Sequence, residues 1–196
     1  MKDIIATDYV PSPSSFLLRR EHARFVKWVN NKVGANINPI ELIELLYSIT
    51  AKFMRAPTKS ATCSKGCYHC CNVYVGVTGL EAYYIHQKTG APIDFKVGKP
   101  PVYDSKPWCP FLKNGECSIY EWRPMACRTF LSFDDPYLCE TNQSHRLFVV
   151  TEQGKGGNEL LNWMYVKTAE ISTQEPLLAV IKDIREFFKL PPGTTR

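Results

Sequence analysis

Four cysteines within nine residues constrain this chain more than any other feature of its sequence. They form the pattern Cys63-x3-Cys67-x2-Cys70-Cys71. A hydrophobic core has no need for thiols at this density, whereas a metal site does, because thiolate sulfur is a strong ligand for zinc and iron. Gly66 directly precedes Cys67, which is typical of a loop that folds around an ion and leaves backbone amides free to donate to sulfur.

Four more cysteines lie further along the chain. The dipeptide Asn114-Gly115 predicts a hairpin turn that would bring Cys109 and Cys117 together across two short strands. We therefore predict that zinc or an iron-sulfur cluster is the cofactor, with spacing alone unable to separate the two. The predicted ligands are Cys63, Cys67, Cys70, Cys71, Cys109, Cys117, Cys127 and Cys139.

The adjacent residues Cys70 and Cys71 bear on the number of metal centres. Neighbouring side chains diverge from the backbone, so it is awkward for both thiols to reach one tetrahedral ion. We expect either two four-ligand sites or one composite cluster, with this pair at the junction. His69 is the one histidine with a ligand-like position, but the cysteines around it favour thiolate ligands.

Basic and aromatic residues surround the next predicted ligand, Cys127. Tyr120, Arg123 and Arg128 lie close to it in sequence. A site of four thiolates carries excess negative charge, which nearby guanidinium groups would offset as donors behind the ligands. The alternative for both arginines is an ordinary salt bridge at the surface.

The compartment decides between thiolates and disulfides. The first fifteen residues carry acids and prolines where a signal peptide needs a basic start and an apolar run, so we expect no export. No window holds the roughly 18 consecutive apolar residues of a membrane span. We therefore expect a cytoplasmic protein without a membrane partner, and reduced thiols there favour metal over the disulfide alternative.

The net charge of +5 counts every thiol as neutral. Eight thiolates holding two divalent ions would lower it to about +1. Net charge then gives little support to nucleic-acid binding. A basic strip on the first predicted helix could meet phosphate, but a solvated helix face is the commoner explanation. This strip contains Arg19, Arg20, Arg24 and Lys27, and His22 lies on the opposite, apolar face.

Apolar periodicity predicts a mainly α-helical fold with a few short β-strands. Helices are expected over 16–33, ended by Gly34, then from 39 to about 55, over 79–89, over 159–169 and from 176 onward, with strands at 73–77 and 147–151. Asn38 and Glu41 predict a capping box for the second helix, and Pro57 is expected to prevent its continuation. Thr78 and Glu81 predict another box, and Gly90 a helix end.

The last predicted helix has an apolar stripe of six residues and is followed by a short tail. The stripe consists of Leu177, Val180, Ile181, Ile184, Phe187 and Phe188. We expect one domain over 16–190, with 60–140 as the cysteine-rich metal-binding centre flanked by helices. Residues 1–15 are expected to form an extended arm, 91–107 and 153–158 loops, and 191–196 a frayed tail.

The cysteine region resembles a known family. The segments Cys-Pro-Phe-Leu from Cys109, Gly-x-Cys-x-Ile-Tyr over 115–120 and Arg-Pro-x-x-Cys-Arg over 123–128 follow the first cysteine group in order. Over about residues 60–140 the chain is similar to the zinc- or iron-chelating cysteine-cluster proteins, also called YkgJ-like or CxxCxxCC proteins. It departs from their motif in having three residues between Cys63 and Cys67. The resemblance implies metal chelation by the eight cysteines, without a specified activity.

Three functions are compatible with these observations. The first is a metal-stabilised structural or regulatory module with an unidentified protein or small-molecule partner. The second is an iron-sulfur enzyme in which Arg123, Arg128 and Tyr120 contact an anionic substrate or cofactor. Flagellin lysine N-methylases, which use S-adenosylmethionine, are similar in their cysteine region. A doubly wound methyltransferase is expected to have a Gly-rich nucleotide-binding loop after a strand. The sequence shows no such loop, which argues against this enzyme. The third is a nucleic-acid or polymerase partner, which would use the basic strip with Lys59 and Lys65.

Overall fold

The computed structural model describes residues 15–32, 37–96, 108–141, 143–148, 158–171, 178 and 180–189. This part of the chain is mainly helical with a few short strands, so the predicted fold class is confirmed. The predicted tail, the loop from 97 to 107, the turn from 153 to 157 and all but the last residue of the predicted arm lie outside these ranges. No helix in the described ranges combines the length and the apolar character needed to cross a bilayer.

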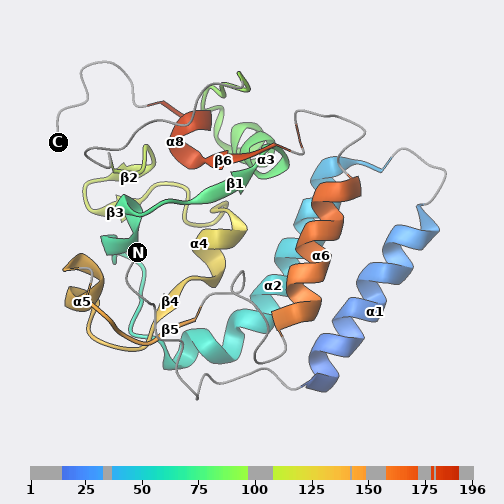
Figure 1. Cartoon of the computed structure of the whole chain (residues 1–196). Helices are drawn as coiled ribbons and strands as arrows, with labels where there is room; N and C mark the ends of the chain where they lie inside the picture. The colour runs from blue at the N-terminus through green and yellow to red at the C-terminus, as the bar shows by residue number, and fades with distance from the viewer. Residues whose placement is uncertain are drawn as a thin grey trace.

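Three long helices form one side of the molecule: α1 (Ser15–Asn31), α2 (Pro39–Ser60) and α6 (Asn158–Ile171). They run side by side (Figure 1) and pack against one another. His22 packs against the ring of Trp163 at a centroid distance of 4.8 Å, as its position on the apolar stripe predicted. The buried residues that join these helices include Leu18, Phe25, Leu42, Leu46, Leu161 and Met164.

The start of α2 differs in one detail from the prediction. The side chain of Asn38 accepts a hydrogen bond from the backbone N–H of Ile40 at 2.9 Å and caps the helix. Glu41 was predicted to reach back to this cap, but its carboxylate lies 3.2 Å from Nζ of Lys32 and forms an ion pair there. Glu41 therefore forms an ion pair with Lys32, which follows α1, instead of the hydrogen bond that would complete a capping box.

The prediction that α2 stops near Arg55 because of Pro57 is wrong. The helix continues to Ser60 with Pro57 buried inside it. Proline removes one donor from the helix, but its carbonyl still accepts, and the N–H of Ala61 donates to Pro57 O at 3.0 Å. The end of α2 runs in a different direction from the turns before it (Figure 1), as a proline kink would make it.

The third helix, α3 (Gly79–Thr89), begins and ends as predicted. Thr78 and Glu81 form a reciprocal capping box at its start. Gly90 adopts φ +70° at its end, in the left-handed region that glycine enters at little cost.

Glu81 has a second role that its place in the capping box did not predict. Its carboxylate accepts hydrogen bonds from the hydroxyls of Tyr47 at 3.0 Å and Tyr165 at 2.9 Å. The backbone N–H of Met125 donates to the same carboxylate at 2.6 Å. Met125 begins α4 (Met125–Thr129), which carries Cys127, so one buried carboxylate joins α2, α3 and α6 to the cysteine region.

The end of the chain is where the predicted elements differ most. Residues Ile181–Asp183 form the strand β6, which pairs antiparallel with β1 (Gly76–Thr78), instead of continuing a helix from 176. Ile181 is 59% exposed, so this member of the predicted stripe is not a core residue. The strand predicted at 73–77 begins only at Gly76. Asp183 and Glu186 then form a capping box that opens the short helix α8 (Ile184–Phe187).

The remaining elements are short and lie on the side of the molecule away from α1 (Figure 1). They are the 3-10 helix η1 (His69–Asn72), α5 (Pro136–Glu140), the hairpin β2 (Leu112–Lys113) and β3 (Glu116–Cys117), and the antiparallel pair β4 (Leu131–Ser132) and β5 (Leu147–Phe148). A second hydrophobic core joins β1, α3 and α8 to the cysteine segments around 109–119. The rest of the strand predicted at 147–151 lies outside the described residues.

Candidate metal centre

The first cysteine loop folds tightly between α2 and β1. Gly66 has φ +98°, a conformation that L side chains rarely adopt, which explains a glycine directly before Cys67. The N–H of Cys67 donates to Ser64 O at 3.1 Å, and the N–H of Cys71 donates to Tyr68 O at 2.8 Å. These turns place Cys70 and Cys71 on η1, and α5 packs against η1.

The first thiol group comprises Cys63, Cys67, Cys70 and Cys139. Burial raises the pKa of Cys63, and the charges of the other three members raise it further. Burial likewise raises the pKa of Cys139, with added effects from Cys67 and Cys70. Because electrostatic effects fall off with distance, mutual influence of this kind indicates that the four thiols share one neighbourhood. This group connects the first cysteine loop to α5.

The second thiol group comprises Cys71, Cys109, Cys117 and Cys127. Burial raises the pKa of Cys109 to about 11, and the charge of Cys117 adds to this effect. Burial raises the pKa of Cys127 well above its usual range, and the charges of Cys109 and Cys117 act in the same direction. This group therefore gathers η1, the β2–β3 hairpin and α4.

The hairpin turn forms as the sequence predicts, but its strands carry only Cys117, because Cys109 lies before β2. Asn114 and Gly115 have φ of +51° and +76°, the conformation of the two-residue turn that joins closely twisted strands. Lys113 pairs with Glu116, so Cys117 stands one pair further along, opposite Leu112. The two-residue turn is what returns Cys117 to the neighbourhood of Cys109.

Cys70 and Cys71 lie where the two groups meet. A hydrogen bond from the thiol of Cys71 lowers the pKa of Cys70 to about 7, and the charge of Arg123 acts in the same direction. The same bond, together with burial, raises the pKa of Cys71. The charge of Cys70 also raises the pKa of Cys117 and of Cys127. The two groups are therefore adjacent, not separate sites at opposite ends of the molecule.

Backbone amides are directed at four of the sulfurs. The N–H of Ser132 donates to Sγ of Cys63 at 3.0 Å. Burial raises the pKa of Cys67, Cys109 and Cys117. In each case the backbone N–H two residues later donates to the sulfur, which lowers the pKa of the thiol. Such donors stabilise a thiolate and are common around metal-bound cysteines. The three later donors are the N–H groups of His69, Phe111 and Ile119.

Arg123 is a cation that acts on three of the thiols, and Arg185 acts on a fourth, Cys109. Its charge lowers the pKa of Cys70, and opposes the raised pKa of Cys117 and of Cys127. Its guanidinium lies 3.9 Å from the centroid of the Tyr120 ring, so this tyrosine supports the arginine. The expected arrangement of a guanidinium behind the thiolates is thus present for Arg123.

Arg128 has a different role from the one we expected beside Arg123. Its Nε donates to the backbone carbonyl of Arg123 at 2.7 Å, and another guanidinium nitrogen donates to the carbonyl of Glu121. The guanidinium also lies 4.1 Å from the centroid of the Tyr47 ring. It therefore holds the backbone before Cys127. Within the described residues, neither arginine forms the carboxylate salt bridge that was the alternative.

Two residues near the end of the chain hold Cys71, and sequence reasoning missed both. A guanidinium nitrogen of Arg185 donates to the backbone carbonyl of Cys71 at 2.8 Å, and so does the N–H of Cys109. Asp183 pairs with Arg185 at 2.8 Å and accepts from the N–H of Val75 at 3.2 Å. The capping box from Asp183 to Glu186 was the available signal, but the apolar stripe suggested one long helix there.

A second histidine, His145, lies beside the thiols in addition to His69, which the sequence singled out. Nε2 of His145 lies 3.2 Å from Sγ of Cys139, and Nδ1 lies 2.6 Å from the carbonyl of Gln143. Metal-binding histidines commonly donate one ring N–H to a carbonyl in this manner. His69 stacks against Tyr68 and lies 3.8 Å from a carboxylate oxygen of Glu140.

The chemistry of the donors fits zinc or iron. Both metals accept four thiolates, and the backbone N–H groups and Arg123 supply the partners that thiolates need. In the part of the chain that the structure describes, no three histidine, cysteine or acidic side chains already stand in the geometry of a metal site. Zinc or iron is therefore indicated by the type of donor and by the proximity of the thiols. Metal binding would draw the sulfurs of each group closer together.

The comparison with protein families identifies the same region. Residues 62–149 match the family model CxxCxxCC, described as "Putative zinc- or iron-chelating domain". The resemblance predicted from the cysteine motifs is therefore confirmed for this stretch, which contains all eight cysteines. No curated protein and no solved structure matches the chain. α1, α2, α6 and α8 lie outside the matched residues.

Proposed function

Because residues 62–149 match the model of a zinc- or iron-chelating domain, we propose that the protein is a metal-stabilised module with two adjacent centres. The first thiol group would hold one ion or cluster, and the second thiol group would hold the other. Bound metal would supply cross-links between loops that have few apolar contacts of their own. The module would act as a structural or regulatory unit on the helical scaffold of α1, α2 and α6.

The observation that supports this proposal is the division of the vicinal pair. Cys70 influences the pKa of Cys63, Cys67 and Cys139, and also that of Cys117 and Cys127 in the second group. The pKa of Cys71 responds, besides Cys70, to Cys109 and Cys127 of the second group. Each group then contains four thiols, the number that a tetrahedral zinc ion or an iron-sulfur cluster requires. A shared pair also explains why the two cysteines are adjacent in the chain.

Metal stoichiometry on protein purified without oxygen tests the proposal. Colourless protein with two zinc ions per chain is expected for the zinc form, and brown protein with broad absorption near about 400 nm for the iron-sulfur form. One zinc ion per chain, or a single cluster, would contradict two centres and favour one composite site.

Variants of the vicinal pair separate the centres. Cys70→Ser is expected to weaken metal binding by the first thiol group, and Cys71→Ser by the second, each leaving about one metal equivalent tightly bound. Ser64→Ala, in the same loop, is the matched control and should keep the full metal content. If both cysteine variants lose all metal, the eight thiols act as one unit.

A further inference from the structure

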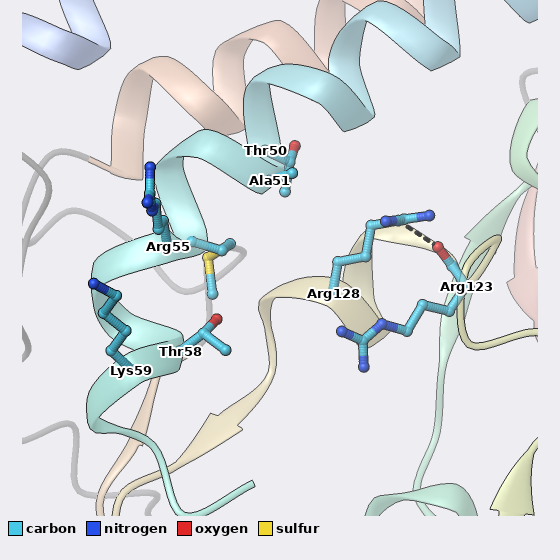
Figure 2. A pocket seen from close by; sticks show the side chains of 8 residues that line it. Thr50, Ala51, Arg55, Thr58, Lys59, Arg123 and Arg128 are labelled. Atoms are coloured by element: carbon cyan, nitrogen blue, oxygen red, sulfur yellow. Dashed lines mark hydrogen bonds between the residues drawn. The ribbon is translucent and has the colours of Figure 1, made fainter. Parts of the chain in front are cut away.

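A cavity of about 380 Å³ lies between α2 and the segment 123–128 (Figure 2). Four cationic residues line it: Arg55 and Lys59 from α2, and Arg123 and Arg128 from the opposite side. In the described parts of the chain, no acidic residue contributes to its lining. A volume of this size is within the range of small-molecule sites. The α2 side lies outside the residues that match the chelating family, so the family description does not account for this cavity.

Among the residues that the structure describes, no acidic side chain neutralises the positive charge in the cavity. Within the described residues, Arg55, Lys59 and Arg123 form no ion pair, and Arg128 donates to backbone carbonyls. Like charges that face one cavity without acids repel one another. An anionic ligand would offset this repulsion in the way that a nearby carboxylate of the protein offsets it elsewhere.

The side chain of Arg123 gives a second indication that the cavity takes an anionic ligand. Its Nε atom is buried and has no hydrogen-bond partner among the described residues. A buried donor without an acceptor has lost its hydrogen bonds to water without replacement, which is why such atoms are rare in folded proteins. In Figure 2 the guanidinium of Arg123 extends toward α2, whereas that of Arg128 turns back to the carbonyl of Arg123.

The α2 side supplies a hydroxyl and an apolar surface besides its cations. Thr58, Met54 and Ala51 line the cavity together with Arg55 and Lys59. In Figure 2 the charged ends of Arg55 and Lys59 turn away from Arg123, on long side chains with several rotatable bonds. The wall of Met54 and Ala51 could contact a carbon skeleton, which an inorganic ion lacks.

From these contacts we propose that the cavity binds the phosphate group of a small phosphorylated molecule. The guanidinium of Arg123 extends toward α2 and can bind two oxygens of a phosphate, and the long side chains of Arg55 and Lys59 can turn toward a bound dianion. The apolar wall would hold the organic part of the ligand. An extended nucleic acid fits less well, because Arg20 and Arg24 of the basic strip on α1 are each paired with Glu21 at 3.4 Å.

Titration of the metal-loaded protein with phenyl phosphate, followed by NMR of amides labelled with nitrogen-15, tests the proposal. The amide signals of Thr58, Lys59 and Arg123 are expected to move with one saturating curve. Inorganic phosphate should move the same signals with lower affinity, because it cannot use the apolar wall. Metal content is measured before and after, since Arg123 also acts on the thiols.

The variant Arg55→Gln/Lys59→Gln removes two cations from the cavity and should raise the Kd for phenyl phosphate by about tenfold or more. Both side chains are exposed, so the fold should survive, which circular dichroism checks. The matched control, Arg19→Gln/Lys27→Gln on α1, changes the net charge equally and should alter the Kd by less than about twofold.

Several outcomes would overturn this inference. Equal weakening in both double variants would mean that net charge alone attracts phosphate. Tighter binding of malonate than of phenyl phosphate would assign the cavity to carboxylates. Tighter binding of a single-stranded oligonucleotide that moves the same signals would assign the surface to nucleic acid. Absence of any binding at millimolar phenyl phosphate would remove the site.

Discussion

The two thiol groups have the same ligand type and number but different surroundings. All four members of the second thiol group belong to or pack against the second hydrophobic core. Of the first thiol group, only Cys63 packs against a core. A metal in the second group would therefore complete a folded core, whereas a metal in the first group would join loops near the surface. Identical donors can thus serve stability in one place and exchange in another.

The backbones that carry the two groups differ in the same way. Cys71 is held at its carbonyl by Arg185 and by the N–H of Cys109, and the β2–β3 hairpin fixes Cys117. The first group depends on the short helix α5 and on the loop around Gly66. Fewer long-range contacts of this kind generally mean a lower free energy of local opening.

The largest expected difference is in stability. Cys127→Ser should remove the second metal and lower the free energy of unfolding by about 3 kcal/mol or more, because it opens a core that metal completes. Cys67→Ser should cost about 1 kcal/mol and leave the second metal bound. Chemical denaturation with metal analysis of both variants measures this. Equal losses would show that the two groups stabilise the fold alike.

Metal release should also distinguish the groups. With a chromogenic chelator in excess, we expect two kinetic phases that differ at least about tenfold in rate, the faster from the first thiol group. Cys67→Ser should abolish the fast phase, and Ser64→Ala should keep both. A single phase in the wild-type protein would mean that the centres exchange as one unit.

The pH dependence of metal affinity should be steeper for the second group. Thiols with raised pKa are protonated at pH 8, so metal must displace one proton from each, and affinity falls as pH falls. Cys70, with a pKa of about 7, is already mostly thiolate at pH 8. Binding should therefore release about three protons in the first group and about four in the second. Calorimetry in buffers of different ionisation enthalpy counts them, and equal counts would contradict this assignment.

The smallest expected effect concerns the hairpin glycine. Gly115→Ala strains a residue at φ +76° and should cost about 1 kcal/mol. Gly90→Ala, at φ +70° behind α3, introduces the same strain away from the thiols. Only Gly115→Ala should speed the slow phase of metal release. Faster release in both variants would show that global stability, not the hairpin, controls the second group.

The local features of this fold could be predicted from sequence because neighbouring residues determine them. The capping box of Thr78 and Glu81, the end at Gly90 and the turn at Asn114-Gly115 are each formed within a few residues. Pro57 and the segment 181–183 were predicted wrongly for the opposite reason. Burial of Pro57 in α2 and pairing of 181–183 with β1 both depend on distant partners.

By itself, the sequence determined the cysteine-rich region and its match to a family model described as zinc- or iron-chelating, because eight thiols and their spacing are a matter of composition and order. It also predicted that Cys70 and Cys71 would lie at a junction, because adjacent side chains diverge. Only the tertiary structure decided which residues surround each of them. Arg185 and α5 lie far from the first loop in sequence, but Arg185 donates to the carbonyl of Cys71 and α5 packs against η1, while Glu81 accepts from the N–H of Met125 near Cys127. Such long-range contacts form only when the whole chain folds.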